Sequence, residues 1–260
     1  MRLARLFAAV FSASLRRELA YRTDLLFRVL TAAIGVGAGL IALRVVYSRT
    51  EALAGWSAAE ATVLLGTFQI VTGLREAFVE PNVRWFGEAV KQGRLDETLL
   101  KPAPSVFLFS LGSCAPLGLA ETALGLAVVV LGLNDLGRSP SAWDVLGWLL
   151  TLAAAGVVTW ASRVLIACAV FWAPDVTLDV LYDALWQFGR YPVGVFHEPL
   201  RFGLTYLLPV ALVATLPARV LVRGATPLAA VAALAASLIG FAAVLAVWEA
   251  GVRRYTGATS

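Results

Sequence analysis

Long apolar runs separated by short polar stretches dominate this chain. Five of them, at about 25–46, 58–80, 105–133, 143–172 and 226–250, are clear from the sequence. Each is long enough to cross the hydrocarbon core of a bilayer as a helix, which takes about 20 residues. A membrane β-barrel would instead show strands of about 10 residues with alternating polarity. The pattern therefore predicts an all-α, polytopic membrane protein.

The stretch between the fourth run and the last one is ambiguous. Residues 176–196 and 202–222 are both apolar enough to cross, but Pro209 and Pro217 interrupt the second segment, and prolines break helices. Either one of the two segments crosses, or both dip into the membrane. With one crossing the chain has six spans, and its two ends lie on the same side.

Residues 1–23 show a different pattern, in which arginines alternate with apolar residues at helical spacing. A basic helix with one apolar face lies in the membrane interface and does not span it. A secretory signal peptide is the alternative, but Ser12-Ala13-Ser14 is a poor cleavage site and Arg16-Arg17 follow a short apolar run. We expect an interfacial helix.

Composition supports a membrane protein and excludes several other classes. The chain has 260 residues, of which 60% are apolar and 15% charged, against about 25% charged residues in a soluble domain. An ordinary soluble enzyme, a disordered chain and a disulfide-stapled secreted module are therefore excluded. The formal charge is +4, but the arginines are scattered, so nucleic-acid binding is not expected. Cys114 and Cys168 lie in apolar segments and are interpreted as packing residues.

The distribution of basic residues predicts the orientation. Most of the Lys and Arg that flank the runs lie on the same side as the N-terminus, and the opposite loops hold only Arg44, Arg49 and Arg138. Cytoplasmic loops carry the excess of basic residues. Both termini are therefore predicted to be cytoplasmic, with the chain in a plasma membrane.

The loop at 81–104 contains a candidate docking helix. Gly93 permits a turn, Asp96 can cap a helix, Glu97 suits its dipole, and Pro102 ends it. Its apolar face consists of Leu95, Leu99 and Leu100. A short surface helix with exposed leucines needs a partner that covers it. The alternative is a loop that folds back on its own bundle.

These features together resemble the permease subunits of type-2 ABC exporters. The motif Gly-x-Leu-Asp-x-x-Leu-Leu-x-Pro occupies 93–102, after the second run, and Tyr191-Pro192 and the segment 208–211 resemble the branch that includes viologen and multidrug exporter permeases. The resemblance implies that 1–23 is an elbow helix. It also implies that the loop after the second run is a cytoplasmic coupling helix.

The resemblance further implies the remaining topology and the partners. Residues 24–260 would form a single six-helix domain, with the fifth span at about 176–192 and an outer re-entrant hairpin at about 197–223. The ATPase-coupling residues would be Gly93, Leu95, Asp96, Glu97, Leu99 and Leu100. The partners would be an ABC ATPase dimer that carries ATP and magnesium, a second copy or a paralogous permease, and the lipids of a bacterial inner membrane.

The sequence carries no catalytic motif that would give this chain its own energy source or enzymatic activity. A P-loop needs Gly-Lys, but the residues before Lys91 and Lys101 are valine and leucine. The single histidine, His197, cannot make the multi-histidine site of a zinc hydrolase. We therefore expect no cofactor in this chain, and no activity as an enzyme on its own.

Ionisable residues inside apolar runs are functional candidates. They are Glu60, Arg75, Glu76, Glu121, Arg163, Asp179, Asp183 and Glu249. One hypothesis is that Glu121, the deepest, acts with Asp179 or Asp183 to attract a cationic amphiphile along a substrate pathway. The alternative is that these residues form ion pairs that fix helix packing.

The function expected from all of this is an ATP-driven export permease for an amphiphilic or lipid-like substrate. A single six-span bundle would provide half of a pathway, so a dimer is expected. An ion-driven secondary transporter is an alternative, although it predicts inverted repeats, which the two halves do not show. An intramembrane enzyme or a purely structural subunit is a third.

Overall fold

The computed structural model describes residues 2–20, 22–101, 104–174, 176, 178–207 and 209–255. Within these ranges the chain consists of helices and connecting loops, without a β-strand. The prediction of an all-α protein is confirmed.

The first half of the bundle consists of an N-terminal pair of helices followed by a long central helix and several short ones. Its elements are α1 (Arg2–Ala20), α2 (Arg22–Tyr47), α3 (Ala58–Leu74), the π turn η1 (Arg75–Val79), α4 (Glu80–Val83), α5 (Phe86–Lys91), α6 (Asp96–Leu99), α7 (Ser105–Leu111), η2 (Pro116–Gly118) and α8 (Leu119–Leu136). A capping box of Ser57 and Glu60 begins α3.

The second half contains two long helices with short pieces between them. They are α9 (Ala142–Cys168), η3 (Ala169–Phe171), α10 (Asp179–Trp186), η4 (Gln187–Arg190), η5 (Val193–Val195), α11 (Leu200–Phe202), the π turns η6 (Gly203–Leu207) and η7 (Ala211–Thr215), α12 (Leu216–Arg223) and α13 (Pro227–Arg254).

Four helices of the described chain are long and apolar enough to cross a membrane: Leu26–Tyr47, Pro116–Leu136, Ala142–Phe171 and Pro227–Arg254. The other two predicted spans differ from these. The run at 58–80 begins as the 17-residue α3, most of which is buried inside the bundle. The segment at 176–192 holds only the eight-residue α10 and the four-residue η4.

The run at 105–133 is not one helix, contrary to our expectation. Helix α7 ends at Leu111, and the chain resumes helical structure only at Pro116. A residue before proline avoids the helical region, and Ala115 accordingly has φ −124° and ψ 77°. Glu121, expected deep within a long span, therefore lies in the first turn of α8.

A second proline, Pro81 in α4, leaves a backbone carbonyl free beside this break. Pro81 has no N–H to donate to the carbonyl of Ala77, four residues earlier. The N–H of Ala115 donates to that carbonyl instead, at 2.8 Å. Because Pro81 leaves the carbonyl of Ala77 free, the hydrogen bond from Ala115 joins the break before α8 to the central helix.

Helices α3 and α8 pack with their backbones in close contact. Glycines recur every seven residues on both, so that Gly66 faces Gly125 and Gly73 faces Gly118 in antiparallel order. A methyl group on Gly125 would lie 2.7 Å from the carbonyl oxygen of Gly66 and from the amide nitrogen of Ile70. Only glycine allows this approach, which small residues commonly provide in membrane helices.

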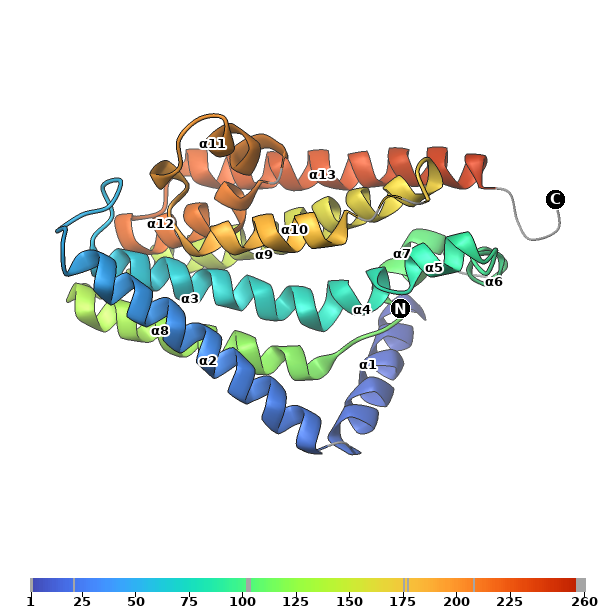
Figure 1. Cartoon of the computed structure of the whole chain (residues 1–260), viewed down its shortest axis with the longest axis horizontal. Helices are drawn as coiled ribbons and strands as arrows, with labels where there is room; N and C mark the ends of the chain where they lie inside the picture. The colour runs from blue at the N-terminus through green and yellow to red at the C-terminus, as the bar shows by residue number, and fades with distance from the viewer. Residues whose placement is uncertain are drawn as a thin grey trace.

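The short elements gather at the two ends of the bundle (Figure 1). Helices α5, α6 and α7 lie at the same end as the last turns of α13, whereas α11 and α12 lie toward the other end. Helix α1 forms a V with α2, and its N-terminal end lies near α4.

The end with α11 and α12 contains a paired arginine. Arg223 donates to both carboxylate oxygens of Glu60 at 3.0 Å, and its guanidinium lies 4.9 Å from the centre of the Trp56 ring. The charge of this arginine is therefore partly compensated by an acid at the start of α3.

Candidate functional site

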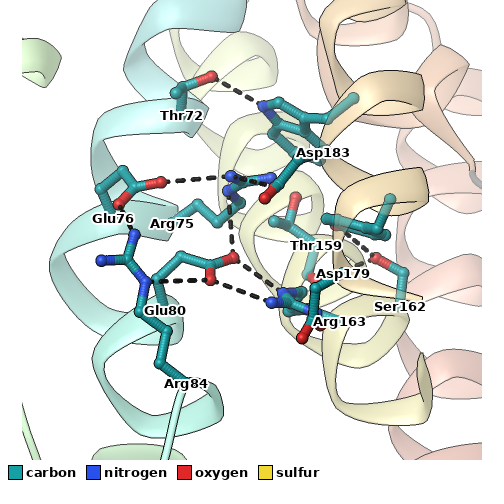
Figure 2. A network of polar contacts seen from close by, with 12 residues as sticks. Thr72, Arg75, Glu76, Glu80, Arg84, Thr159, Ser162, Arg163, Asp179 and Asp183 are labelled. Atoms are coloured by element: carbon teal, nitrogen blue, oxygen red, sulfur yellow. Dashed lines mark hydrogen bonds and ion pairs between the residues drawn. The ribbon is translucent and has the colours of Figure 1, made fainter. Parts of the chain in front are cut away.

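A network of charged side chains lies between the central helix and helices α9 and α10 (Figure 2). Arg75, Glu76 and Glu80 come from the π turn and α4, and Arg163 comes from α9. The opposite side is completed by Asp179 and Asp183 of α10. The network thus joins three helical segments that are far apart in the sequence.

Arg163 and Glu80 form the buried centre of this network. Arg163 donates through Nε to Glu80 Oε1 at 2.9 Å and through Nη2 to Oε2 at 3.2 Å. Their side chains are 2% and 3% exposed. Arg163 Nη1 also donates to Asp179. A buried charge is tolerated when it is paired and hydrogen-bonded in this way.

Arg75 forms the second buried cationic centre. Its Nη2 donates to Asp183 at 2.9 Å and to Glu76 at 3.2 Å, and its Nε lies 3.4 Å from Glu80. The guanidinium also lies 4.8 Å from the centre of the Trp186 ring, a distance typical of a cation–π contact.

The π turn explains why Arg75 and Glu80 meet. In a π turn the hydrogen bond runs from residue i to i+5, and the N–H of Glu80 indeed donates to the carbonyl of Arg75. Residues five apart therefore stand on the same face, which an ordinary α-helix would not arrange. The turn aims both charged side chains at α9 and α10.

The structure does not bring the three predicted pathway acids together. Asp179 and Asp183 are half-exposed and bound to Arg163 and Arg75. Glu121 accepts a hydrogen bond from Gln69 at 3.2 Å, and no contact with either aspartate is found among the described residues. The arrangement corresponds to inter-helix ion pairing, the alternative interpretation.

Glu80 was missed by sequence reasoning, although it is the most connected acid of the network. It stands at the very end of the second apolar run, where it looked like a boundary residue. Its position four residues after Glu76 and five after Arg75 was the available signal. That signal required knowledge of the π turn, which apolar patterning does not provide.

Fewer leucines of the candidate docking helix are exposed than the sequence predicted. Leu95 is fully buried and Leu99 half-buried, so only Leu100 of the three leucines is open, at 85% exposure. Leu95 occupies the N-cap position of α6 and Asp96 is the first helical residue, which corrects the capping role expected of Asp96. Gly93 has φ 69°, so it does form the predicted turn. Pro102 lies outside the described residues.

Leu95 is buried in the same hydrophobic core as the aromatic side chains of Phe86, Phe109, Phe171 and Trp248. The Trp248 ring centre lies 5.6 Å from that of Phe86 and 4.9 Å from that of Phe109. Its Nε1 donates to Ser105 at 3.1 Å. Because Trp248 belongs to α13, the core fixes the segment around α6 to the last long helix.

Tyr255 extends this connection past the end of α13. It packs against the aromatic core. Burial and the neighbouring Asp96 carboxylate raise the pKa of the Tyr255 phenol. The first residue after α13 therefore lies against the first residue of α6.

Helix α1 is attached by contacts that the sequence did not indicate. Phe7 and Phe11 each have ring centres within 6.3 Å of Phe78. The carboxylate of Glu18 accepts a hydrogen bond from the backbone N–H of Leu117 at 2.8 Å. The amphipathic helix is thus bound to the break before α8.

An all-helical bundle with four long apolar helices and a charged network in its interior is typical of an integral membrane protein. Residues 33–259 match the family model described as ABC-2 family transporter protein. The chain therefore belongs to the ABC-2 transporter family, as a membrane component that works with an ABC ATPase. Neither a curated protein nor a solved structure matches the chain.

Proposed function

We propose that this chain is the permease subunit of an ATP-driven exporter, which moves an amphiphilic or lipid-like substrate out of the cell. ATP and magnesium would bind to a separate ATPase dimer. The observation that carries the proposal is the position of Leu100. It is 85% exposed directly after α6, on a segment that is anchored by the buried Leu95 in the aromatic core.

The contacts of α6 suit a coupling role. Leu95 packs in the same core as Trp248 of α13, and the segment's other neighbours include Phe86 and Phe109. A displacement of α6 by the ATPase would therefore be transmitted to α13 through close-packed side chains, which resist compression. Leu100 would make the contact, and Leu95 would transmit the motion.

The proposed topology has both termini and α6 on the cytoplasmic side. It is supported by the gathering of α5, α6, α7 and the end of α13 at one end of the bundle (Figure 1). In this proposal the segment at 176–192, whose α10 and η4 are shorter than the about 20 residues of a full helical crossing, is the fifth of six membrane segments, and 197–223 is an outer re-entrant hairpin. Helix α1 is the interfacial elbow, and a second permease subunit completes the pathway.

The test is co-purification with an ABC ATPase expressed from the same operon. Leu100→Asp places a charge on the proposed contact without disturbing the core, and it should lower recovery of the ATPase by about tenfold. Leu200→Asp alters a leucine of α11, at the opposite end, and should leave recovery unchanged. Full ATPase binding and full ATP-dependent transport by Leu100→Asp would overturn the coupling role.

A further inference from the structure

A cavity of about 460 Å³ lies between α1, α7 and the segment that contains α5 and α6. The residues that α1 and α7 contribute to its lining are apolar and include Leu6, Val10, Phe107 and Leu111. The volume is in the range of sites that hold small molecules, about 300–1,000 Å³. The function proposed above does not account for this cavity.

The charged residues of the lining all come from one short segment, 94–101. They are Arg94, Glu97 and Lys101. Arg94 lies two residues before the start of α6 at Asp96, and Lys101 lies two residues after its end at Leu99. The cavity is therefore amphipathic, with its charges around α6 and its apolar residues on α1 and α7.

The two cations of the lining are accessible and carry no ion pair. The side chains of Arg94, Glu97 and Lys101 are exposed, so a ligand can reach them. Glu97 lies three residues after Arg94 and four before Lys101, spacings at which charged residues of a helix commonly pair. Neither pair forms, and no other acid in the described part of the chain pairs with either cation. Two cations against one acid leave an excess of positive charge in the lining.

The chemistry of the lining identifies the class of ligand. Phosphate oxygens accept charge-assisted hydrogen bonds from both arginine and lysine. A free phosphate would pair with Arg94 and Lys101 but would leave the apolar lining from α1 and α7 in water. A purely apolar molecule would cover that lining and pair with neither cation, and a cationic molecule would be repelled by both. An anionic amphiphile matches both parts of the cavity.

The position of the cavity indicates which anionic amphiphile is available. Helix α1 is the helix that the sequence predicts to lie in the membrane interface, and its Arg5, Arg16 and Arg17 are exposed. Anionic phospholipids are attracted to basic segments at the cytoplasmic membrane surface, and basic pockets on that side bind their head groups. In the topology proposed above, a cavity between α1 and α6 lies at the depth of these head groups.

We propose that this cavity binds the head group of an anionic phospholipid, with Arg94 and Lys101 on the phosphate and the acyl chains against the apolar residues of α1 and α7. The bound lipid would contact the chain on both sides of α6 and join this segment to α1. The location of the site at the membrane surface rests on the topology proposed above, whereas binding to the purified chain does not.

The test is a lipid titration of the full chain in a neutral detergent, followed by native mass spectrometry. Phosphatidylglycerol should bind about tenfold more tightly than phosphatidylcholine with the same acyl chains, because only the former has a net negative charge. Glycerophosphoglycerol, which is the same anionic head group without acyl chains, should not displace the lipid at equal concentration. This comparison separates a phospholipid from a free phosphate compound as the ligand.

Charge variants test which cations hold the phosphate. Arg94→Gln and Lys101→Gln should each weaken the binding of phosphatidylglycerol by about fivefold, the equivalent of about 1 kcal/mol for each basic residue. The binding of phosphatidylcholine should stay unchanged in both. Lys91→Gln is the matched control, because Lys91 is an exposed lysine on α5 that does not belong to the lining.

A variant on α1 tests the opposite side of the cavity. Leu6→Glu places an acid in the lining, where it would repel a phosphate, and should also weaken the binding of phosphatidylglycerol by about fivefold. Leu19→Glu makes the same change at an exposed leucine of α1 outside the lining and should have no effect. Equal effects of these two variants would contradict a site between α1 and α6.

Three further outcomes would overturn the proposal. Equal affinity for the two lipids would show that the cations do not select the head group. A loss in Lys91→Gln as large as that in Lys101→Gln would show diffuse surface charge, and displacement by glycerophosphoglycerol would show a site for a free phosphate compound. Leu100→Asp should bind phosphatidylglycerol as the unaltered chain does, so loss of lipid binding and loss of ATPase coupling are distinguishable.

Discussion

Glu80 on α4 and Arg163 on α9, 83 residues apart in the chain, form a two-point ion pair with N–O distances of 2.9 and 3.2 Å. Both side chains are almost fully buried. Removing one partner of such a pair strands the other charge in a low-dielectric interior. The cost is usually larger than the net contribution of the intact pair.

Glu80→Gln should therefore lower the free energy of unfolding by about 3–5 kcal/mol. The measurement is thermal or denaturant unfolding of the purified chain in a mild detergent. Glu249→Gln, which breaks the exposed pair with Arg253 at 3.4 Å, is the control and should change stability by about 0.5 kcal/mol or less. Equal effects of the two substitutions would contradict a central role for the buried pair.

Gly125→Ala should separate α3 from α8. The added methyl group would lie 2.7 Å from backbone atoms of Gly66 and Ile70, which cannot move aside without parting the helices. We expect a loss of about 1–3 kcal/mol. Gly35→Ala meets open space and should stabilise its helix by up to about 1 kcal/mol. The same unfolding assay applies, and a stabilising Gly125→Ala would refute the close contact.

Glu18→Ala should loosen helix α1. The variant leaves the N–H of Leu117 without its acceptor, a loss of about 1–3 kcal/mol for a hydrogen bond to a charged group. Trypsin cleavage at Arg16-Arg17 in inside-out vesicles should become faster. Glu51→Ala, in an exposed loop, should leave the cleavage rate at that of the unaltered chain.

Trp248→Ala should release the segment around α6 from α13. It opens a void in the aromatic core and removes the hydrogen bond to Ser105, at a cost of about 3–5 kcal/mol. Hydrogen exchange at 95–100 should speed up more than exchange in α3. Trp143→Ala, which truncates an exposed tryptophan, should alter neither segment. Unchanged exchange at 95–100 in Trp248→Ala would disprove the connection.

Tyr255→Phe tests the electrostatic side of the same connection. Because the pKa of Tyr255 is raised in the folded chain, folding holds the phenol proton more tightly, and this stabilisation is lost as pH rises through the folded pKa. The unaltered chain should therefore lose stability in the alkaline range relative to Tyr255→Phe. If the free energies of unfolding of the two proteins run parallel with pH through the alkaline range, the phenol is not buried beside Asp96.

The sequence by itself determined the helical class and the membrane location. Apolar runs of about 20 residues leave no other means of satisfying the backbone in a bilayer. It also predicted the turn at Gly93 and the short helix after it, because a left-handed turn and a short amphipathic segment are local properties. The family resemblance rested on the same local signals.

Only the tertiary structure decided which charges meet and which leucines are covered. The pairing of Glu80 with Arg163 depends on a π turn that shifts the helical register, and Leu95 is buried in a core that includes Trp248 from the last helix. A cavity of about 620 Å³ likewise lies where α3, α7, α9 and α13 meet. Such contacts join residues distant in the chain, so no local pattern of apolar and polar positions records them.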